Sequence, residues 1–318
     1  QFKVYLRGMN KNTVAFLLLL VLSGIWGSSF ILMKLSMETT EGVQIFSDKQ
    51  VGALRILIAC LFLLPVTIKI LKKLKSMKDF LFIAIVGVCG NFLPAFLFTY
   101  AQTELSSGYT GMLNSFTPVF TLILGSFLFK QRLTLVQFIG VSISFIGIVF
   151  LMRAGKNMTG TTSFPHILAV IAATFCYGLS LNSIKHRLSH LNSVEITALS
   201  FGILLIPSIM VNIGVDTYAV FKENSYVWEA LGYISILSIV GTALALVIFN
   251  RVIALSSTLF ASSVTYFIPI VAVLIGSSFG EKINGLQIGS MFIILIGVFV
   301  ANYWKLLFKS DDKSALQE

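Results

Sequence analysis

The sequence predicts an all-α integral membrane protein with ten transmembrane helices in two inverted five-helix repeats around a central cavity. The composition, a set of long apolar runs and an internal repeat lead to this fold class. Hydrophobic residues make up 56% of the 318 residues, charged residues make up 11%, and the mean hydropathy is +0.91. Because about a quarter of the residues in a soluble domain are charged, soluble enzymes, disordered chains and nucleic-acid binders are excluded.

Ten apolar runs are long enough to cross a bilayer, which takes about 20 residues as a helix. The predicted spans are 14–34, 50–71, 79–100, 107–129, 134–152, 164–185, 194–213, 227–250, 257–279 and 285–306. The connections are mostly short, so no soluble domain is expected between them. Several spans contain proline, which membrane helices tolerate because neighbouring helices satisfy the freed backbone groups.

The distribution of Lys and Arg predicts the orientation. With a cytoplasmic N-terminus, sixteen Lys and Arg lie inside and six outside, and this bias favours cytoplasmic placement of both termini. The net charge of +10 then reflects cationic cytoplasmic loops. The expected segments are a tail over 1–13, a first repeat over 14–152, a linker over 153–163, a second repeat over 164–306 and a tail over 307–318. Residues 1–8 precede Met9, a candidate natural start, and the sequence leaves open whether these eight residues are native or a remnant.

The two halves of the chain carry matching residues at a separation of 150 or 151. The matched pairs are Leu105-Ser106-Ser107 with Leu255-Ser256-Ser257, Pro118 with Pro269, Gly125 with Gly276, Gly147 with Gly297, and Trp26-Gly27 with Tyr177-Gly178. Each repeat holds five spans, so the second copy begins on the opposite side of the membrane. Inverted repeats are typical of secondary transporters, in which the two copies supply the two faces of an alternating-access cycle.

Several short motifs resemble those of one known family. They are Ser23-Gly24-Ile25-Trp26-Gly27-Ser28-Ser29-Phe30, Ala53-Leu54-Arg55, Thr117-Pro118, Glu281-Lys282 and the glycine-containing last span. In order and spacing they resemble the EamA family of the drug/metabolite transporter superfamily over residues 12–306. The resemblance implies a ten-helix, two-repeat transporter of small metabolites, often an exporter of amino acids or related compounds. The chain has Lys130-Gln131-Arg132 where the family usually has Gly-Glu-Arg, so any role of the acidic turn is left to Glu281.

The sequence contains no ATP-binding or zinc-protease motif. A GxxxxGK[ST] phosphate loop and HExxH are both absent from the sequence, so neither an enzyme nor an ATPase partner is expected. Cys60, Cys89 and Cys176 lie singly in apolar runs and are interpreted as small apolar residues. We therefore expect no cofactor and no metal site.

All 13 acidic residues fall in tails, in loops or at span ends. Proton-coupled pumps usually need a carboxylate within the membrane, and efflux of hydrophobic cations needs a buried anion. The pattern therefore favours facilitated diffusion of a metabolite, or coupling through a loop carboxylate.

Arg55 is the one strongly ionised residue predicted within a span, about 9 Å from its outer end at 1.5 Å per residue. It faces a substrate carboxylate, snorkels to the outer interface or holds helix ends together; the sequence leaves these alternatives open. The other candidate substrate-binding residues are neutral polar or aromatic residues near mid-span or just before Pro118 and Pro269: Trp26, Asn91, Asn114, Thr117, Tyr177, Thr265 and Tyr266. A proline frees a carbonyl one turn earlier, so we expect both of these proline-containing helices to bend at matching places.

These observations predict a secondary transporter that moves a small neutral or zwitterionic metabolite, such as an amino acid, outward by alternating access. A drug or nucleoside exporter of the same superfamily is the alternative, and a membrane enzyme, a lipid-handling protein or a channel is a more distant one. The expected partners are a small-molecule substrate and the lipid bilayer, with no nucleic acid. A bacterial inner membrane is the expected location, and the substrate and oligomeric state stay open.

Overall fold

The computed structural model describes residues 11–74, 76–159, 164–256 and 264–307, and this part of the chain is nearly all helical. The helices of the first half are α2 (Lys11–Met37), α3 (Asp48–Ile70), η2 (Leu71–Lys73), α4 (Met77–Gly87), η3 (Val88–Phe92), α5 (Leu93–Ala101), α6 (Ser107–Asn114), α7 (Thr117–Phe129) and α8 (Leu135–Thr159). Those of the second half are α9 (Phe164–Arg187), α10 (Ser193–Gly214), α11 (Thr217–Glu223), α12 (Val227–Ser238), η4 (Ile239–Leu244), α13 (Ala245–Leu255), α15 (Val264–Ser278) and α16 (Gly285–Leu307). A single isolated bridge joins Glu38 to Gln44 within the described residues.

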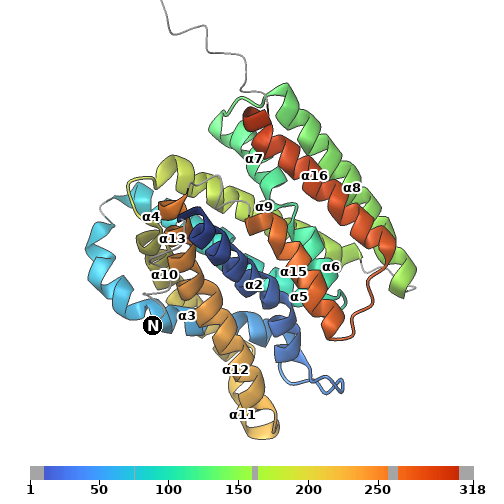
Figure 1. Ribbon diagram of the computed structural model, residues 1–318. Helices are drawn as coiled ribbons and strands as arrows, with labels where there is room; N and C mark the ends of the chain where they lie inside the picture. Colours follow the sequence, from blue (N-terminus) through green and yellow to red (C-terminus); the bar gives the residue numbers. More distant parts are fainter. Residues whose placement is uncertain (1–10, 75, 160–163, 257–263, 308–318) are drawn as a thin grey trace, which may run out of the picture.

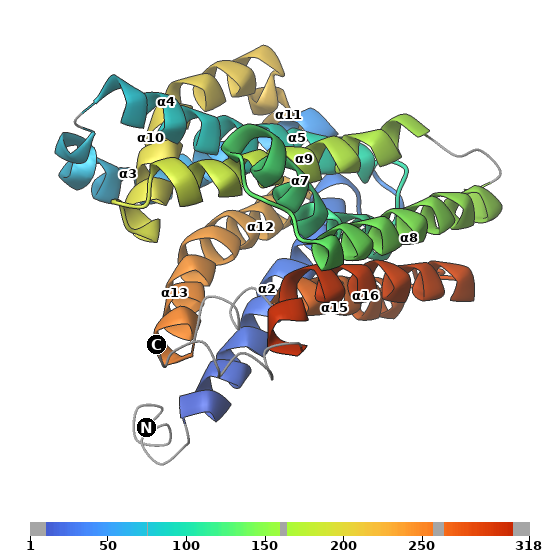
Figure 2. The same cartoon turned by 90° about the horizontal axis from the view of Figure 1, so that it is seen from above.

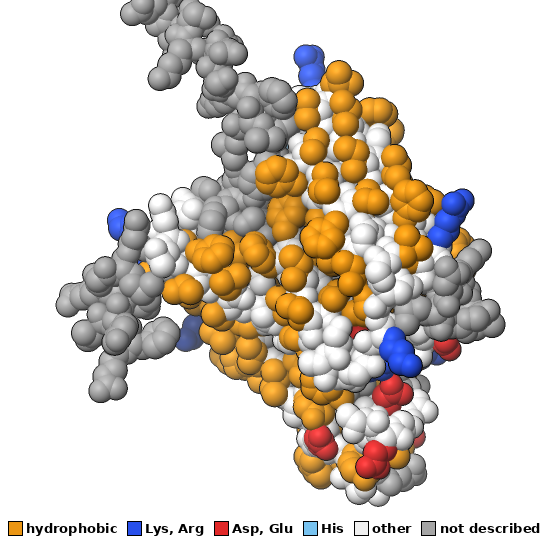
Figure 3. All heavy atoms as spheres, turned by 45° about the vertical axis from the view of Figure 1, so that its right-hand side comes forward, with side chains coloured by type: hydrophobic (Ala, Val, Ile, Leu, Met, Phe, Trp, Pro, Cys, Tyr) orange, Lys and Arg blue, Asp and Glu red, His pale blue; other side chains and the backbone are white. Residues whose placement is uncertain are grey.

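Eight of the described helical segments are long and apolar enough to cross a membrane, and α15 and part of α16 form two shorter apolar helices. Residues 257–263, with which the ninth predicted span begins, lie outside the described residues. Large apolar side chains point outward, for example Phe127, which is 82% exposed, and Trp228, which is 70% exposed. Figure 3 shows a broad hydrophobic surface with the acidic side chains gathered at its lower end. This distribution is that of a multi-pass membrane protein whose apolar surface faces lipid.

Local capping explains where several helices begin. At the start of α3, the Ser47 hydroxyl accepts the Gln50 N–H at 3.3 Å while the Gln50 side-chain oxygen accepts the Ser47 N–H at 2.9 Å. Asn192 and Glu195 form the same reciprocal pair at the start of α10.

At the other end of the first half, α8 continues beyond the predicted end at 152 to Thr159. The predicted tails within 1–10 and 308–318 and the linker residues 160–163 lie outside the described residues.

The predicted span 107–129 is broken into α6 and α7, as the position of Pro118 indicates. Pro118 lies in the first turn of α7, where it needs no intrahelical N–H partner. The Asn114 carbonyl at the break accepts the Thr117 hydroxyl at 2.9 Å. The break is not repeated at the matching Pro269, which lies inside the continuous helix α15; the bend predicted at Pro269 stays a prediction. Here the packing of α15 against α2 and α6 holds the backbone helical in spite of the proline.

A π-helical turn interrupts the third membrane helix of each half. These turns are η3 and η4, and they begin at Val88 and Ile239, which are 151 residues apart. Each contains a glycine at the matching position, Gly90 and Gly241. Sequence patterns did not predict these turns, which are often found at functional sites.

The packing of the helices follows the repeat. The first helix of each half packs against the third and fourth helices of the other half: α2 lies against α12, α13 and α15, and α9 lies against α4, α5 and α7. The second helices, α3 and α10, pack together, and so do the fifth helices, α8 and α16, which run side by side in both views (Figures 1 and 2). Exchanging the two halves leaves this pattern of pairings unchanged.

Glycines bring α8 and α16 into close contact. A Cβ at Gly140 would lie 2.5 Å from the Gly297 carbonyl oxygen, and one at Gly297 would lie 2.6 Å from the Gly140 carbonyl oxygen. Ser144 between them donates to the Ile294 carbonyl at 3.3 Å. Small residues that allow backbones to approach are the usual means of helix association in membranes, so this pair forms a rigid element.

The turns after α7 and after α15 share a left-handed residue at matching positions. Lys130 has φ 55° and Gly280 has φ 84°, and the two are 150 residues apart. Glycine adopts this conformation at little cost, whereas a side chain raises its energy by about 1–2 kcal/mol. The first turn is therefore strained where the second is not.

We expect Lys130→Gly to raise the free energy of unfolding by about 0.5–1 kcal/mol, because the relief of strain exceeds the entropy cost of glycine. Gly280→Ala, the matched control, should lower it by a similar amount, since a Cβ there meets nothing within 4 Å and only the backbone is strained. Thermal unfolding in detergent or nanodiscs measures both. A lower melting temperature for Lys130→Gly would contradict this explanation.

Candidate functional site

The eight residues predicted to bind substrate are all half-buried, being neither fully enclosed nor on the outer surface. They lie on helices of both halves: Trp26 on α2, Arg55 on α3, Asn91 on η3, Asn114 on α6, Thr117 on α7, Tyr177 on α9, and Thr265 and Tyr266 on α15. Their contacts divide them into groups, of which the group around Arg55 combines charge with aromatic surface.

Arg55 lies in the interior of the helix bundle. Its Nη1 approaches the Met33 sulfur of α2 at 3.6 Å, and the Tyr177 side chain of α9 lies near the guanidinium. Among the residues that the structure describes, the ion pairs are those of Lys34, Lys73 and His190, and none includes Arg55. Three helices thus surround a cation that lacks a carboxylate within the described part of the chain.

Two aromatic pairs stand at repeat-related positions. The Tyr177 ring stacks on Phe98 of α5 with centroids 5.9 Å apart, and the Trp26 ring lies against Phe249 of α13, also at 5.9 Å. Phe98 and Phe249 are 151 residues apart, as are Trp26 and Tyr177. Trp26 and Tyr177 therefore each pack on a phenylalanine of the other half.

Trp26 also contacts a π-turn. Its indole N–H donates to the Gly241 carbonyl of η4 at 3.0 Å. A π-turn shifts carbonyls out of the regular helical register, so this bond satisfies a backbone group in the membrane interior. Trp26 consequently holds α2 against the third helix of the second half.

The other π-turn carries a polar and a thiol side chain. The Asn91 amide donates only a long bond of 3.5 Å to the Val86 carbonyl, while the Cys89 thiol lies near the Cys176 thiol of α9, and both cysteines are free. From the sequence, these cysteines were interpreted as isolated apolar residues. Their proximity could not be predicted, because they lie far apart along the chain. Among the described residues, no third His, Cys, Asp or Glu lies with these two cysteines to form a possible metal site.

The remaining predicted residues serve other contacts. Asn114 and Thr117 bond to each other at the break between α6 and α7, with a side-chain contact of 3.4 Å in addition to the backbone one. Tyr266 packs edge-on against Phe299 of α16, with centroids 6.3 Å apart. The structure thus brings Arg55 together with Tyr177 and places Asn114, Thr117 and Tyr266 in separate contacts.

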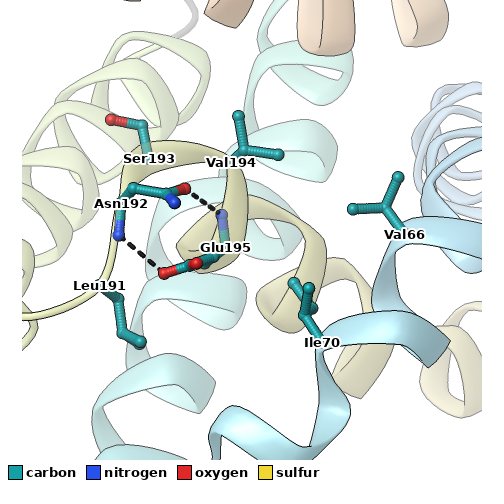
Figure 4. Close-up of a pocket in the computed structure, with 7 residues that line it drawn as sticks. All are labelled: Val66, Ile70, Leu191, Asn192, Ser193, Val194 and Glu195. Atoms are coloured by element: carbon teal, nitrogen blue, oxygen red, sulfur yellow. Dashed lines mark hydrogen bonds between the residues drawn. The ribbon is translucent and has the colours of Figure 1, made fainter.

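A cavity of about 500 Å³ lies elsewhere, and none of the eight predicted residues lines it. Its lining is Val66, Ile70, Leu191, Asn192, Ser193, Val194 and Glu195, at the end of α3 and the start of α10 (Figure 4). The Glu195 carboxylate there accepts the Asn192 N–H at 3.0 Å and also pairs with Lys73. Both oxygens already have partners within the protein, so this groove offers a ligand little beyond apolar surface, and the Arg55 group is the stronger candidate.

Comparisons with known proteins agree with a transporter. The model of the EamA-like transporter family matches residues 13–153 and again residues 164–303. The uncharacterized inner membrane transporter YedA of Escherichia coli K12 is 25% identical over 289 residues, covering 89% of both chains. A probable amino-acid metabolite efflux pump of Salmonella typhimurium is 21% identical over 211 residues, covering 65% of this chain and 71% of the pump.

One crystal structure of a protein has the same fold, with a TM-score of 0.56 and 17% sequence identity. The similarity covers 94% of this chain and 99% of that chain. At this identity the similarity concerns the fold alone.

The bond between Trp26 and Gly241 gives a stability prediction. Trp26→Phe should lower the free energy of unfolding by about 1–3 kcal/mol, because it leaves a buried carbonyl without its donor. Trp228→Phe is the matched control: Trp228 is exposed, and its replacement should change stability little. Melting temperatures in detergent test this, and equal values for the two variants would show that the indole N–H contributes nothing.

Proposed function

The chain belongs to the EamA-like transporter family, and we propose that it is a secondary transporter that moves a small neutral or zwitterionic metabolite, an amino acid or a related compound, outward by alternating access. The observation that supports this substrate class is the interior position of Arg55 without a carboxylate among the described residues. The similarity to a probable amino-acid metabolite efflux pump points to the same class of substrate.

An uncompensated cation in the membrane interior is costly, and such residues usually mark substrate or ion pathways. A guanidinium presents a rigid fork of donors that matches a carboxylate with two parallel hydrogen bonds. Met33, the neighbour of Arg55 on α2, offers a thioether that accepts hydrogen bonds only weakly. A substrate carboxylate would therefore supply the charge that the protein itself does not place beside Arg55.

The aromatic neighbours suit the other end of a zwitterion. Tyr177 lies within electrostatic reach of Arg55 and stacks on Phe98. An ammonium group over an aromatic face gains about 0.5–2 kcal/mol. The same stacked rings could also hold a flat heterocycle, which is why a drug or nucleoside carrier is the second candidate.

The proposed architecture is ten helices in two inverted repeats, the first over 14–152 and the second over 164–306, with both termini cytoplasmic in a bacterial inner membrane. Its support is the exchange symmetry of the helix pairings, the double match of the family model and the sixteen-to-six distribution of Lys and Arg. An odd number of spans in each repeat requires the second to begin on the opposite side.

Transport by variants of Arg55 tests the substrate class. In proteoliposomes without an ion gradient, counterflow of labelled amino acids should identify a substrate. Arg55→Gln should raise its half-saturating concentration about tenfold or more. Arg55→Lys keeps the charge but loses the fork of donors, so its half-saturating concentration should lie between those of the unaltered protein and Arg55→Gln. The exposed Arg251 gives the matched control Arg251→Gln, which should behave as the unaltered protein.

Substrate analogues separate the two candidate functions. An amide or ester of the substrate should be handled poorly by the unaltered protein and equally poorly by Arg55→Gln. If Arg55→Gln transports the carboxylate normally, Arg55 is not its partner. Counterflow of nucleosides, with no counterflow of any amino acid, would instead favour the drug or nucleoside carrier.

Reporter fusions test the orientation. A reporter enzyme that is active only outside the cytoplasm should be silent when fused after residue 318 and active when the chain is cut and fused after Glu41. The reverse activities would contradict cytoplasmic termini. Activity at both positions would contradict an even number of spans.

A further inference from the structure

The carboxylate of Glu281, in the turn between α15 and α16, reaches across to the other half of the protein. One oxygen accepts the Ser107 N–H at 2.7 Å and the other accepts the Gly108 N–H at 2.9 Å. The ammonium group of Lys34, near the end of α2, lies 3.9 Å from the same carboxylate, whose side chain is 6% exposed. A single side chain thus joins the start of α6, the α15–α16 turn and the end of α2.

These contacts are strong for a physical reason. The first N–H groups of a helix have no partner within it, and the helix dipole favours an anion there. Hydrogen bonds to an ionised acceptor are roughly twice as strong as neutral ones. The low exposure of Glu281 keeps water from competing for these N–H groups.

Two glycines make this approach possible. A Cβ at Gly276 would overlap a Glu281 carboxylate oxygen, and one at Gly108 would lie 2.8 Å from the Ile283 side chain. Gly276 therefore keeps open the space that the carboxylate occupies. This accounts for a repeat-matched glycine that the sequence alone did not explain.

The matching turn of the first half carries no charge at this position. Gln131, 150 residues before Glu281, follows the left-handed Lys130 as Glu281 follows the left-handed Gly280. Its amide donates to the Asn182 side chain of α9 at 3.3 Å and contacts His186. A Cβ at Gly125, the counterpart of Gly276, would lie 3.1 Å from this amide. The same turn geometry thus presents a carboxylate at one end of the bundle and an amide at the other.

We infer that Glu281 is a positioning residue of the transport cycle, a latch that holds the start of α6 closed against the α15–α16 turn and α2. The matching turn around Gln131 has no ionised counterpart of this contact, and the ion pairs at that end, Lys73–Glu195 and His190–Asp79, join other elements. The latch therefore favours the conformation in which the end around Glu281 is closed. In the proposed orientation this is the outer end. This role rests on the proposed function, because the two conformations are those of alternating access.

Hydrogen exchange of the full-length protein in nanodiscs tests the latch without any substrate. In Glu281→Gln the amide can accept only one of the two N–H groups and loses the charge. We expect about tenfold faster exchange over 103–112 and 278–284, equivalent to about 1.4 kcal/mol. Because the two ends open alternately, exchange over 128–134 and 184–192 should become slower.

Matched variants of the repeat separate a latch from a local support. Gly276→Ala should reproduce the effect of Glu281→Gln on exchange at both ends, because the added methyl group displaces the carboxylate. Gly125→Ala is the repeat-related control for the added methyl group. The melting temperature of each variant verifies that it is folded.

The outcomes are distinct. Reciprocal changes at the two ends would support the latch, even if no transported compound is found. Faster exchange confined to Ser107 and Gly108, with the opposite end unchanged, would reduce Glu281 to a helix cap and overturn the inference. Equal acceleration at both ends would also overturn it, since that result indicates general loosening.

Discussion

Lipid cannot hydrogen-bond a peptide group, and this one constraint determines most of the structure. Within a bilayer each backbone N–H and C=O needs a partner inside the protein, which accounts for the nearly all-helical chain. It also explains the side chains found where helices are irregular. The Thr117 hydroxyl satisfies the Asn114 carbonyl at the break before α7, and the Trp26 indole satisfies Gly241 in a π-turn. Glu281 does the same for the first two N–H groups of α6.

The hydrophobic effect, which assembles the cores of soluble proteins, is weak between membrane helices, because lipid is as apolar as leucine. Membrane helices associate instead through close approach of their backbones. Gly140 and Gly297 bring α8 and α16 together until the backbones touch, whereas α6 is held to the turn after α15 by one carboxylate. A carrier needs both kinds of contact: interfaces fixed by shape, and interfaces held by a few polar bonds that can be broken and remade. The close-packed pair is α8 and α16. The polar contacts of Glu281 lie at the ends of α2, α6 and α15.

Features that follow from local composition were predictable from the sequence, and those set by contacts between halves were not. Apolar length predicted the eight helices of the described residues that are long enough to cross a membrane, and Pro118 predicted the break in the fourth span; ten spans in inverted repeats stay a prediction. Pro269 has the same sequence signal without a break, because packing of α15 decides the outcome. The π-turns left no signal beyond Gly90 and Gly241. Arg55 and Tyr177 were each predicted singly. Their proximity, their phenylalanine neighbours and the proximity of Cys89 to Cys176 depend on the fold. Whether the eight residues bind substrate stays a prediction.

The two π-turns also carry historical information. A π-turn results from one extra residue inserted into a helix, and an insertion made after a duplication would be present in one copy only. Here the turns begin at Val88 and Ile239, at the spacing that separates Phe98 from Phe249 and Pro118 from Pro269. The irregularity therefore belongs to the repeated unit and not to one half of the chain. Each half thus brings the same irregular third helix to the first helix of the other half, so both copies of the contact carry backbone carbonyls displaced from the regular helical register.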